Sequence, residues 1–194
     1  MKAVMSNVPP EILAWRKTTG ADRWDEMWEG VLHLAPAPNR VHQDLSFALE
    51  AYLRNHWARP NGCKAYREIN VAPPGGWPHS YRIPDLVLLS PDRFAIDKNE
   101  YFEGAPLVVV EIRSPHDETY EKLPFYASLG IPEVWVIERD SKKPEIHLLD
   151  GNGYRLQLED PEGWLHSPAT GIEMRASSAE KLQLRPVDAE LPED

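Results

Sequence analysis

Two acidic residues stand beside the two most apolar runs of the chain. Asp85 precedes the aliphatic run 86–89, and Glu111 directly follows the aliphatic run 107–110. A carboxylate next to four aliphatic residues is partly removed from water, which is costly unless it is paired or binds a metal ion. On neighbouring strands the two acids can converge on one hard cation, because Mg²⁺ uses one or two protein carboxylates. The alternative is that Asp85 caps a turn and Glu111 forms a strand-end ion pair.

A lysine follows Glu111 where the next helix should begin. Lys122 lies within 118–129, which we expect to be helical and to end at Gly130. A first-turn lysine can reach back over the preceding strand end, orient a water or stabilise charge on a phosphate. Pro124 leaves two possibilities, because proline is tolerated only in a first turn: the helix begins near Tyr120, or it is kinked and displaces Lys122. A solvated surface lysine is the alternative.

His42 opens the clearest predicted helix, 41–57, with Asn39 as its expected cap. It could hydrogen-bond a site carboxylate or a phosphate, and the alternative is a histidine that only satisfies the helix end. Six tryptophans could stack on bases, although core or interface packing explains most of them. They are Trp24, Trp28, Trp57, Trp77, Trp135 and Trp164.

The elements that position these residues form a mixed α/β pattern. The continuous apolar runs 86–89, 107–110 and 134–137 predict central strands buried on both faces. Further strands are expected at 30–34 and 65–71, with outer strands or hairpins at 145–149, 154–158 and 172–184. A first helix is expected at 9–17.

The motifs together resemble the Uma-two family of restriction endonucleases, within the PD-(D/E)XK nuclease superfamily. The strings that carry the resemblance are Trp28–Pro38 with His42-Gln43, Pro84-Asp85, Glu111–Pro115, Lys122, Tyr126 and Gly130–Trp135. The likeness implies an α+β fold, with a mixed central sheet flanked by helices and the acids on a central hairpin. The chain adds further C-terminal strands.

The resemblance also implies roles for individual residues. Asp85 and Glu111 match the metal-binding acids, and Glu29 matches an acid that the superfamily often adds from the N-terminal part. Lys122 matches a lysine that this family carries on the following helix. Arg113 occupies the usual lysine position two residues after Glu111. Arginine cannot accept a proton at neutral pH but can bind a phosphate, so Arg113 is expected to contact substrate.

Composition limits the alternatives. The chain has 194 residues, 21 Lys and Arg against 31 Asp and Glu, a formal charge of −10 and one cysteine. This predicts one domain over 1–186 with a disordered acidic tail at 187–194, and it excludes a disulfide framework and a cysteine-rich zinc site. A net charge of −10 argues against coating nucleic acid by bulk charge. No signal peptide or membrane span is evident, so a cytoplasmic location without membrane association is expected.

We therefore expect a metal-dependent endonuclease acting on DNA, with Mg²⁺ or Mn²⁺ as cofactor and His42 and Arg113 contacting substrate. A homodimer is expected, because cutting both strands of a duplex needs two sites related by a two-fold axis. The alternative is a non-catalytic protein with a nuclease fold that acts as a binding or assembly module. The charge of −10 and the arginine in the lysine position favour that alternative.

Overall fold

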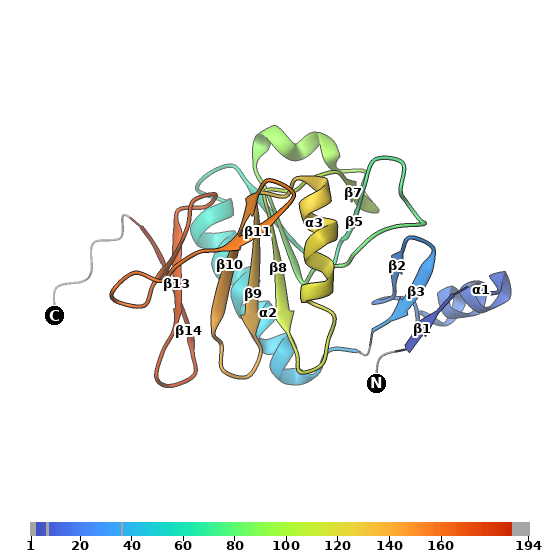
Figure 1. Cartoon of the computed structure of the whole chain (residues 1–194), viewed down its shortest axis with the longest axis horizontal. Coiled ribbons are helices and arrows are strands. Elements are labelled where there is room, and N and C mark those ends of the chain that lie inside the picture. Colours follow the sequence, from blue (N-terminus) through green and yellow to red (C-terminus); the bar gives the residue numbers. More distant parts are fainter. Residues whose placement is uncertain (1–2, 7, 36, 188–194) are drawn as a thin grey trace.

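The computed structural model describes residues 3–6, 8–35 and 37–187 (Figure 1). Its centre is a six-stranded sheet in the order β11-β10-β9-β8-β6-β4. Strands β8 and β9 run parallel, and the other neighbouring pairs are antiparallel. The strands are β4 (Lys64–Arg67), β6 (Leu86–Leu89), β8 (Val108–Arg113), β9 (Glu133–Glu138), β10 (Pro144–Asp150) and β11 (Gly153–Leu156). The predicted mixed sheet is confirmed.

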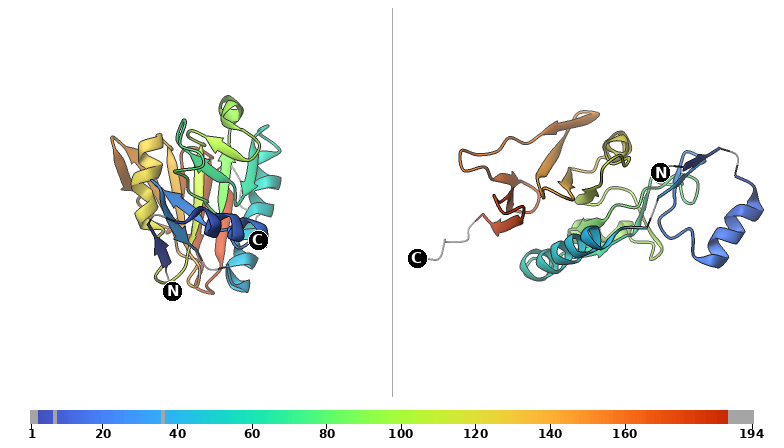
Figure 2. Two further views of the ribbon diagram at one scale, coloured as in Figure 1. Left: turned by 90° about the vertical axis from the view of Figure 1, so that its right-hand side faces the viewer. Right: turned by 90° about the horizontal axis from the view of Figure 1, so that it is seen from below.

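Helices cover both faces of this sheet, as the predicted fold class requires (Figures 1 and 2). On one face, α2 (Arg40–Leu53) buries Leu45, Leu49 and Leu53 against alternate residues of the central strands. On the other face, α3 (Leu123–Leu129) buries Phe125 and Tyr126 against the remaining residues. Because successive strand residues point to opposite faces, the continuous aliphatic runs supply both cores.

Smaller sheets and short helical turns complete the chain. The N-terminal sheet joins β1 (Ala3–Met5), β3 (Val31–Leu34) and β2 (Glu26–Trp28), and β5 (Asn70–Ala72) pairs with β7 (Tyr101–Glu103). The C-terminal sheet contains β12 (Leu165–Ser167), β13 (Ile172–Ala176) and β14 (Leu182–Pro186). Helix α1 (Pro10–Thr19) has no buried residue. A π-helical turn spans Arg54–Ala58, and 3₁₀ turns span Pro91–Ile96 and Tyr120–Lys122.

Three predicted elements differ from the structure at turns. The segment 65–71 forms two strands, separated by Glu68 with a φ of 50°. The segment 172–184 contributes to two antiparallel strands, β13 and β14. The helix predicted at 41–57 changes to the π-helical turn after Leu53. In the first two segments a short polar turn interrupts the apolar pattern without changing its overall periodicity, so the pattern alone did not locate these breaks. In the third, helical geometry continues and only its hydrogen-bond pattern changes.

The structure can be compared with two further expectations, the acidic tail and the absence of a membrane-spanning helix. Of the predicted acidic tail 187–194, residues 188–194 lie outside the described residues. No helix in the described part of the chain is long and apolar enough to cross a membrane.

Glu133 ties the C-terminal sheet to the central sheet, and we expect its replacement to be costly. Its buried carboxylate accepts hydrogen bonds from Ser167 Oγ at 2.6 Å, the Ala169 amide at 2.7 Å and Trp135 Nε1 at 3.0 Å. Each buried donor left without an acceptor costs about 1–3 kcal/mol. The substitution Glu133→Ala should therefore lower the free energy of unfolding by about 3 kcal/mol or more, measured by urea denaturation.

Glu145 offers the matched control on the neighbouring strand. Its side chain is 32% exposed and contacts His147 and Tyr120. Glu145→Ala should cost less than about 1 kcal/mol. Equal losses in the two variants would contradict the role assigned to Glu133.

Candidate active site

Strand register brings Asp85 and Glu111 together. Strands β6 and β8 are antiparallel, and Leu86 pairs with Val110. One step outward along each strand therefore places Asp85 beside Glu111. The amide of Ile112 donates to Asp85 Oδ2 at 2.6 Å, which locks this carboxylate next to the end of β8. Both acids line one pocket of about 600 Å³.

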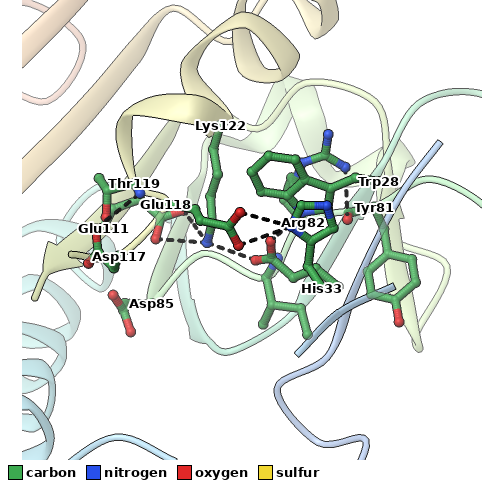
Figure 3. Close-up of polar contacts among 12 residues, drawn as sticks. Trp28, His33, Tyr81, Arg82, Asp85, Glu111, Asp117, Glu118, Thr119 and Lys122 are labelled. Atoms are coloured by element: carbon green, nitrogen blue, oxygen red, sulfur yellow. Dashed lines mark hydrogen bonds and ion pairs between the residues drawn. The ribbon is translucent and has the colours of Figure 1, made fainter. Parts of the chain in front are cut away.

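Lys122 completes the cluster from the start of α3. Its Nζ lies 3.2 Å from both carboxylate oxygens of Glu111 and 2.7 Å from Glu26 Oε1 (Figure 3). The 3₁₀ turn Tyr120–Lys122 precedes α3, and Pro124 sits in the first turn of α3. Proline therefore removes no intrahelical hydrogen bond. Of the two possibilities left by the sequence, the helical segment begins near Tyr120 and Lys122 reaches the acids.

The loop between β8 and α3 is held by its own hydrogen bonds. Asp117 accepts from the Ser114 amide at 2.6 Å and from the Thr119 amide at 3.1 Å. At the far end, the Tyr126 hydroxyl donates to Glu111 Oε1 at 2.5 Å. The loop and α3 thus fix Lys122 above Glu111 from two sides.

Glu26, and not Glu29, is the acid that the N-terminal part supplies to this cluster. Besides Lys122, the Glu26 carboxylate accepts from the Ile83 amide at 2.8 Å and from Trp28 Nε1 at 2.7 Å. The Glu29 side chain is 69% exposed, ion-pairs with Arg82 and accepts from Ser80. It does not line the pocket. The structure therefore places Glu29 outside the pocket and brings Glu26 to the acid cluster.

The reason lies in the hairpin between β2 and β3. Glu29 and Gly30 form its two-residue turn, with φ values of 46° and 87°. Turns of this kind carry a residue followed by glycine between the strands. A turn residue points into solvent, whereas Glu26 belongs to the strand. The pair Glu29-Gly30 is a turn signal in the sequence, and it could have indicated that Glu29 points into solvent and that Glu26 lies in the strand.

His42 contacts the site from the start of α2. Asn39 caps this helix by accepting from the His42 amide at 3.0 Å. The His42 Nε2 atom lies 2.7 Å from Asp85 Oδ1. His42 therefore contacts a carboxylate of the acid cluster, as one of the two interpretations of the sequence expects. A second histidine that the sequence did not single out, His33, lies in the same pocket. It stacks on Trp28 at 4.0 Å and contacts Glu118 at 3.0 Å.

Arg113 is not among the residues that line the pocket. Its guanidinium pairs with Glu138 at 2.8 Å on the parallel neighbour β9 and lies over the Tyr120 ring at 5.0 Å. The structure therefore does not bring Arg113 together with the predicted site residues. Arg139, which follows β9, lines the pocket and donates to Ser114 Oγ at 3.4 Å. Parallel neighbours such as β8 and β9 end at the same edge of the sheet. The position of Arg139 just after the third apolar run could therefore have placed it near Glu111.

Comparison with known proteins places this arrangement in a family. A family model described as "Putative restriction endonuclease", Uma2, matches residues 9–180, which is most of the chain. The chain belongs to the Uma2 family. The resemblance inferred from the sequence motifs is thereby confirmed. The search of curated proteins finds no match to this Uma2 chain.

A solved structure supports the same fold. It is the crystal structure of a protein described as a putative nuclease belonging to DUF820, from Anabaena variabilis ATCC 29413. The TM-score is 0.60 at 18% sequence identity, over 75% of this chain and 82% of that chain. Family and fold together are those of a restriction-endonuclease-like nuclease.

The electrostatics of this Uma2 site reflect an excess of negative charge. Three carboxylates, Glu26, Asp85 and Glu111, surround the single ammonium of Lys122. Burial raises the pKa of Glu111 to about 8; Lys122 opposes this shift, and Asp85 and Glu26 add to it. Burial alone would lower the pKa of Lys122, but Glu111 and Glu26 outweigh it and raise that pKa. The cluster therefore retains a proton that ordinary carboxylates would release.

This charge excess predicts a pH dependence of stability in protein kept free of divalent ions. The pKa of Glu111 is raised from 4.5 to about 8 on folding, so between these values the folded state binds more protons than the unfolded state. The free energy of unfolding should then fall as pH rises through this window, by up to about 1.4 kcal/mol per pH unit. Urea denaturation in EDTA at several pH values measures the slope.

Glu111→Gln serves as the comparison, because it removes the titrating group and keeps an oxygen that can accept from Tyr126. The difference between wild type and variant isolates Glu111 from the histidines that titrate in the same range. Parallel stability curves for the two proteins would refute the prediction.

Proposed function

We propose that this Uma2 protein is a metal-dependent endonuclease that hydrolyses phosphodiester bonds in DNA. The observation that carries the proposal is the Lys122 ammonium, held 3.2 Å from Glu111 and 2.7 Å from Glu26 in a pocket that Asp85 also lines. Burying two carboxylates, with a third beside them, around one ammonium is unfavourable for stability, because the cost of desolvation exceeds the energy that one ion pair returns. Strongly perturbed groups in a cleft are characteristic of functional sites.

The donor set fits a hard divalent cation. Asp85 and Glu111 offer carboxylate oxygens, and Mg²⁺ commonly takes one or two carboxylates while keeping water for the remaining positions. Mn²⁺ accepts the same donors. Among the described residues, no group of three or more His, Cys, Asp or Glu side chains is arranged to hold a metal ion. A bound cation would polarise the phosphate and make hydroxide available near neutral pH.

Each neighbouring residue then has a definable task. Lys122 would donate hydrogen bonds to a phosphate oxygen and stabilise its developing negative charge. Tyr126, bonded to Glu111, fixes the orientation of that carboxylate, and the Ile112 amide does the same for Asp85. His42 would hold the second oxygen of Asp85 or turn to a substrate phosphate.

Cleavage assays test this proposal. Purified protein is incubated with supercoiled plasmid, linear duplex, gapped duplex and single-stranded oligonucleotides, with Mg²⁺, Mn²⁺ or EDTA. We expect cleavage with either ion and none in EDTA. If no substrate in a broad sequence panel is cut with either ion, the non-catalytic nuclease-fold alternative replaces the proposal.

The homodimer is proposed separately, because it concerns the cutting of both strands and not the chemistry of one site. Light scattering coupled to gel filtration should give a mass near twice that of the 22.1 kDa chain. A monomer mass at assay concentration would reject the dimer and leave the site proposal intact.

A further inference from the structure

The pocket beside the acid cluster combines a charged end with an apolar lining. Next to Lys122 and the carboxylates, the lining includes Trp24, Leu34, Ala37, Pro38, Ile83 and Pro115. Its volume of about 600 Å³ falls within the range of pockets that bury small molecules, about 300–1,000 Å³. A site that contacted only the phosphate backbone of a duplex would have no use for this apolar lining.

We propose that the pocket binds an unpaired nucleotide of a DNA strand, with the base against the apolar lining at Trp24 and the phosphate beside Lys122. The inference rests on the proposed function and names the form of substrate that this site accepts. In a paired duplex the faces of each base are covered by its neighbours. An unpaired nucleotide can expose a face to an aromatic side chain and enter a pocket.

Trp24 supplies the most specific support. It lines the pocket, yet its indole Nε1 atom is buried without an acceptor among the described residues. The indole N–H can only donate, and a buried donor without an acceptor is unfavourable. Every base and every phosphate carries acceptor atoms. Satisfying this donor requires the indole to turn toward the pocket, where a bound base or phosphate would supply the acceptor.

The charges around the pocket argue against recognition of a duplex through its phosphates. Six carboxylates line the pocket, those of Glu26, Glu68, Asp85, Glu111, Asp117 and Glu118, against the cations of Lys122 and Arg139. Lys122 is paired with two of these acids, and Arg139 pairs with Asp140 at 2.9 Å. Proteins that hold duplex DNA by its backbone neutralise many phosphates with Lys and Arg. Base contacts must therefore supply a large share of the affinity.

Fluorescence anisotropy with labelled oligonucleotides tests the proposal, with Ca²⁺ in place of Mg²⁺ so that binding is measured without cleavage. A single strand should bind at least about tenfold more tightly than the duplex of the same sequence. Trp24→Ala should weaken single-strand binding about tenfold, as expected when a stacking side chain is lost. Trp24→Phe keeps an aromatic ring but removes the indole N–H, and it should weaken binding about threefold.

Trp15→Ala is the matched control, because Trp15 is 58% exposed on α1 and does not line the pocket. Its affinity for the single strand should equal that of wild type. Thermal unfolding establishes that each variant is folded. Tighter or equal binding of duplex, or equal effects of Trp24→Ala and Trp15→Ala, would overturn the proposal.

The outcomes also separate this inference from the proposed function. Cleavage of duplex without preference for unpaired strands would reject the inference and retain the nuclease. If single-stranded DNA binds in a way that depends on Trp24 but no metal ion supports cleavage, the nucleotide-binding proposal stands and the endonuclease proposal is rejected. If the protein neither binds nor cuts DNA, both fall.

Discussion

Replacing Lys122 with methionine is expected to reduce cleavage at saturating DNA by about a hundredfold or more, since a positioned group that stabilises transition-state charge is removed. Methionine keeps much of the side-chain volume and lacks the charge. Because the ammonium lies between Glu26 and Glu111, its loss also leaves two buried carboxylates unpaired. A loss of about 3 kcal/mol of stability is expected from this. Rates are therefore compared per folded molecule, with the folded fraction determined by circular dichroism.

Two further variants sharpen this result. Lys122→Arg restores the charge, but the planar guanidinium cannot take the place of a compact ammonium among two carboxylates. It should recover less than about a tenth of the wild-type rate. Lys181→Met, at an exposed loop lysine, controls for loss of one positive charge and should leave the rate unchanged. Equal rates for wild type and Lys122→Met would show that the lysine is structural only.

Replacing Asp85 with asparagine is expected to weaken Mg²⁺ or Mn²⁺ binding by about tenfold or more and to abolish detectable cleavage. Asparagine retains an oxygen that can accept from the Ile112 amide, so the local structure should persist. The charge that attracts the cation is lost, and hard cations depend on anionic oxygen ligands. Isothermal titration calorimetry with each ion gives the affinity, and plasmid cleavage gives the activity.

Glu68→Gln is the matched control for Asp85→Asn. Glu68 lines the same pocket but pairs with Arg23 at 3.3 Å and lies outside the cluster around Lys122. Its replacement removes one negative charge from the pocket and should change cation affinity by less than about threefold. Similar losses in the two variants would mean that overall charge, and not ligation by Asp85, governs cation binding.

The central part of the site could be predicted from the sequence because it rests on strand patterns and on local spacing. Continuous aliphatic runs can be buried only in the middle of a covered sheet, and an acid at the end of each run therefore lies at a sheet edge. Asp85 and Glu111 meet because β6 and β8 are neighbours in register. Lys122 lies 11 residues beyond Glu111, close enough for a short loop and one helical turn to return it to the strand end. The positions of Asp85, Glu111 and Lys122 depend on short stretches of chain, so residue types and their spacing are enough to predict them.

The remaining members of the site depend on contacts between segments far apart in the chain, which no local pattern encodes. Glu26 reaches the cluster because Ile83, 57 residues later, supplies an amide to its carboxylate, whereas Glu29 is directed outward by the hairpin turn. Arg113 is drawn from the pocket by Glu138, its partner across the parallel pair β8 and β9. Trp24 lies on the pocket wall because the N-terminal segment packs beside the loop that follows β8. Residue type and periodicity determined which side chains could do chemistry. Only tertiary packing, which sets the neighbours of each charge, decided which of them share one pocket.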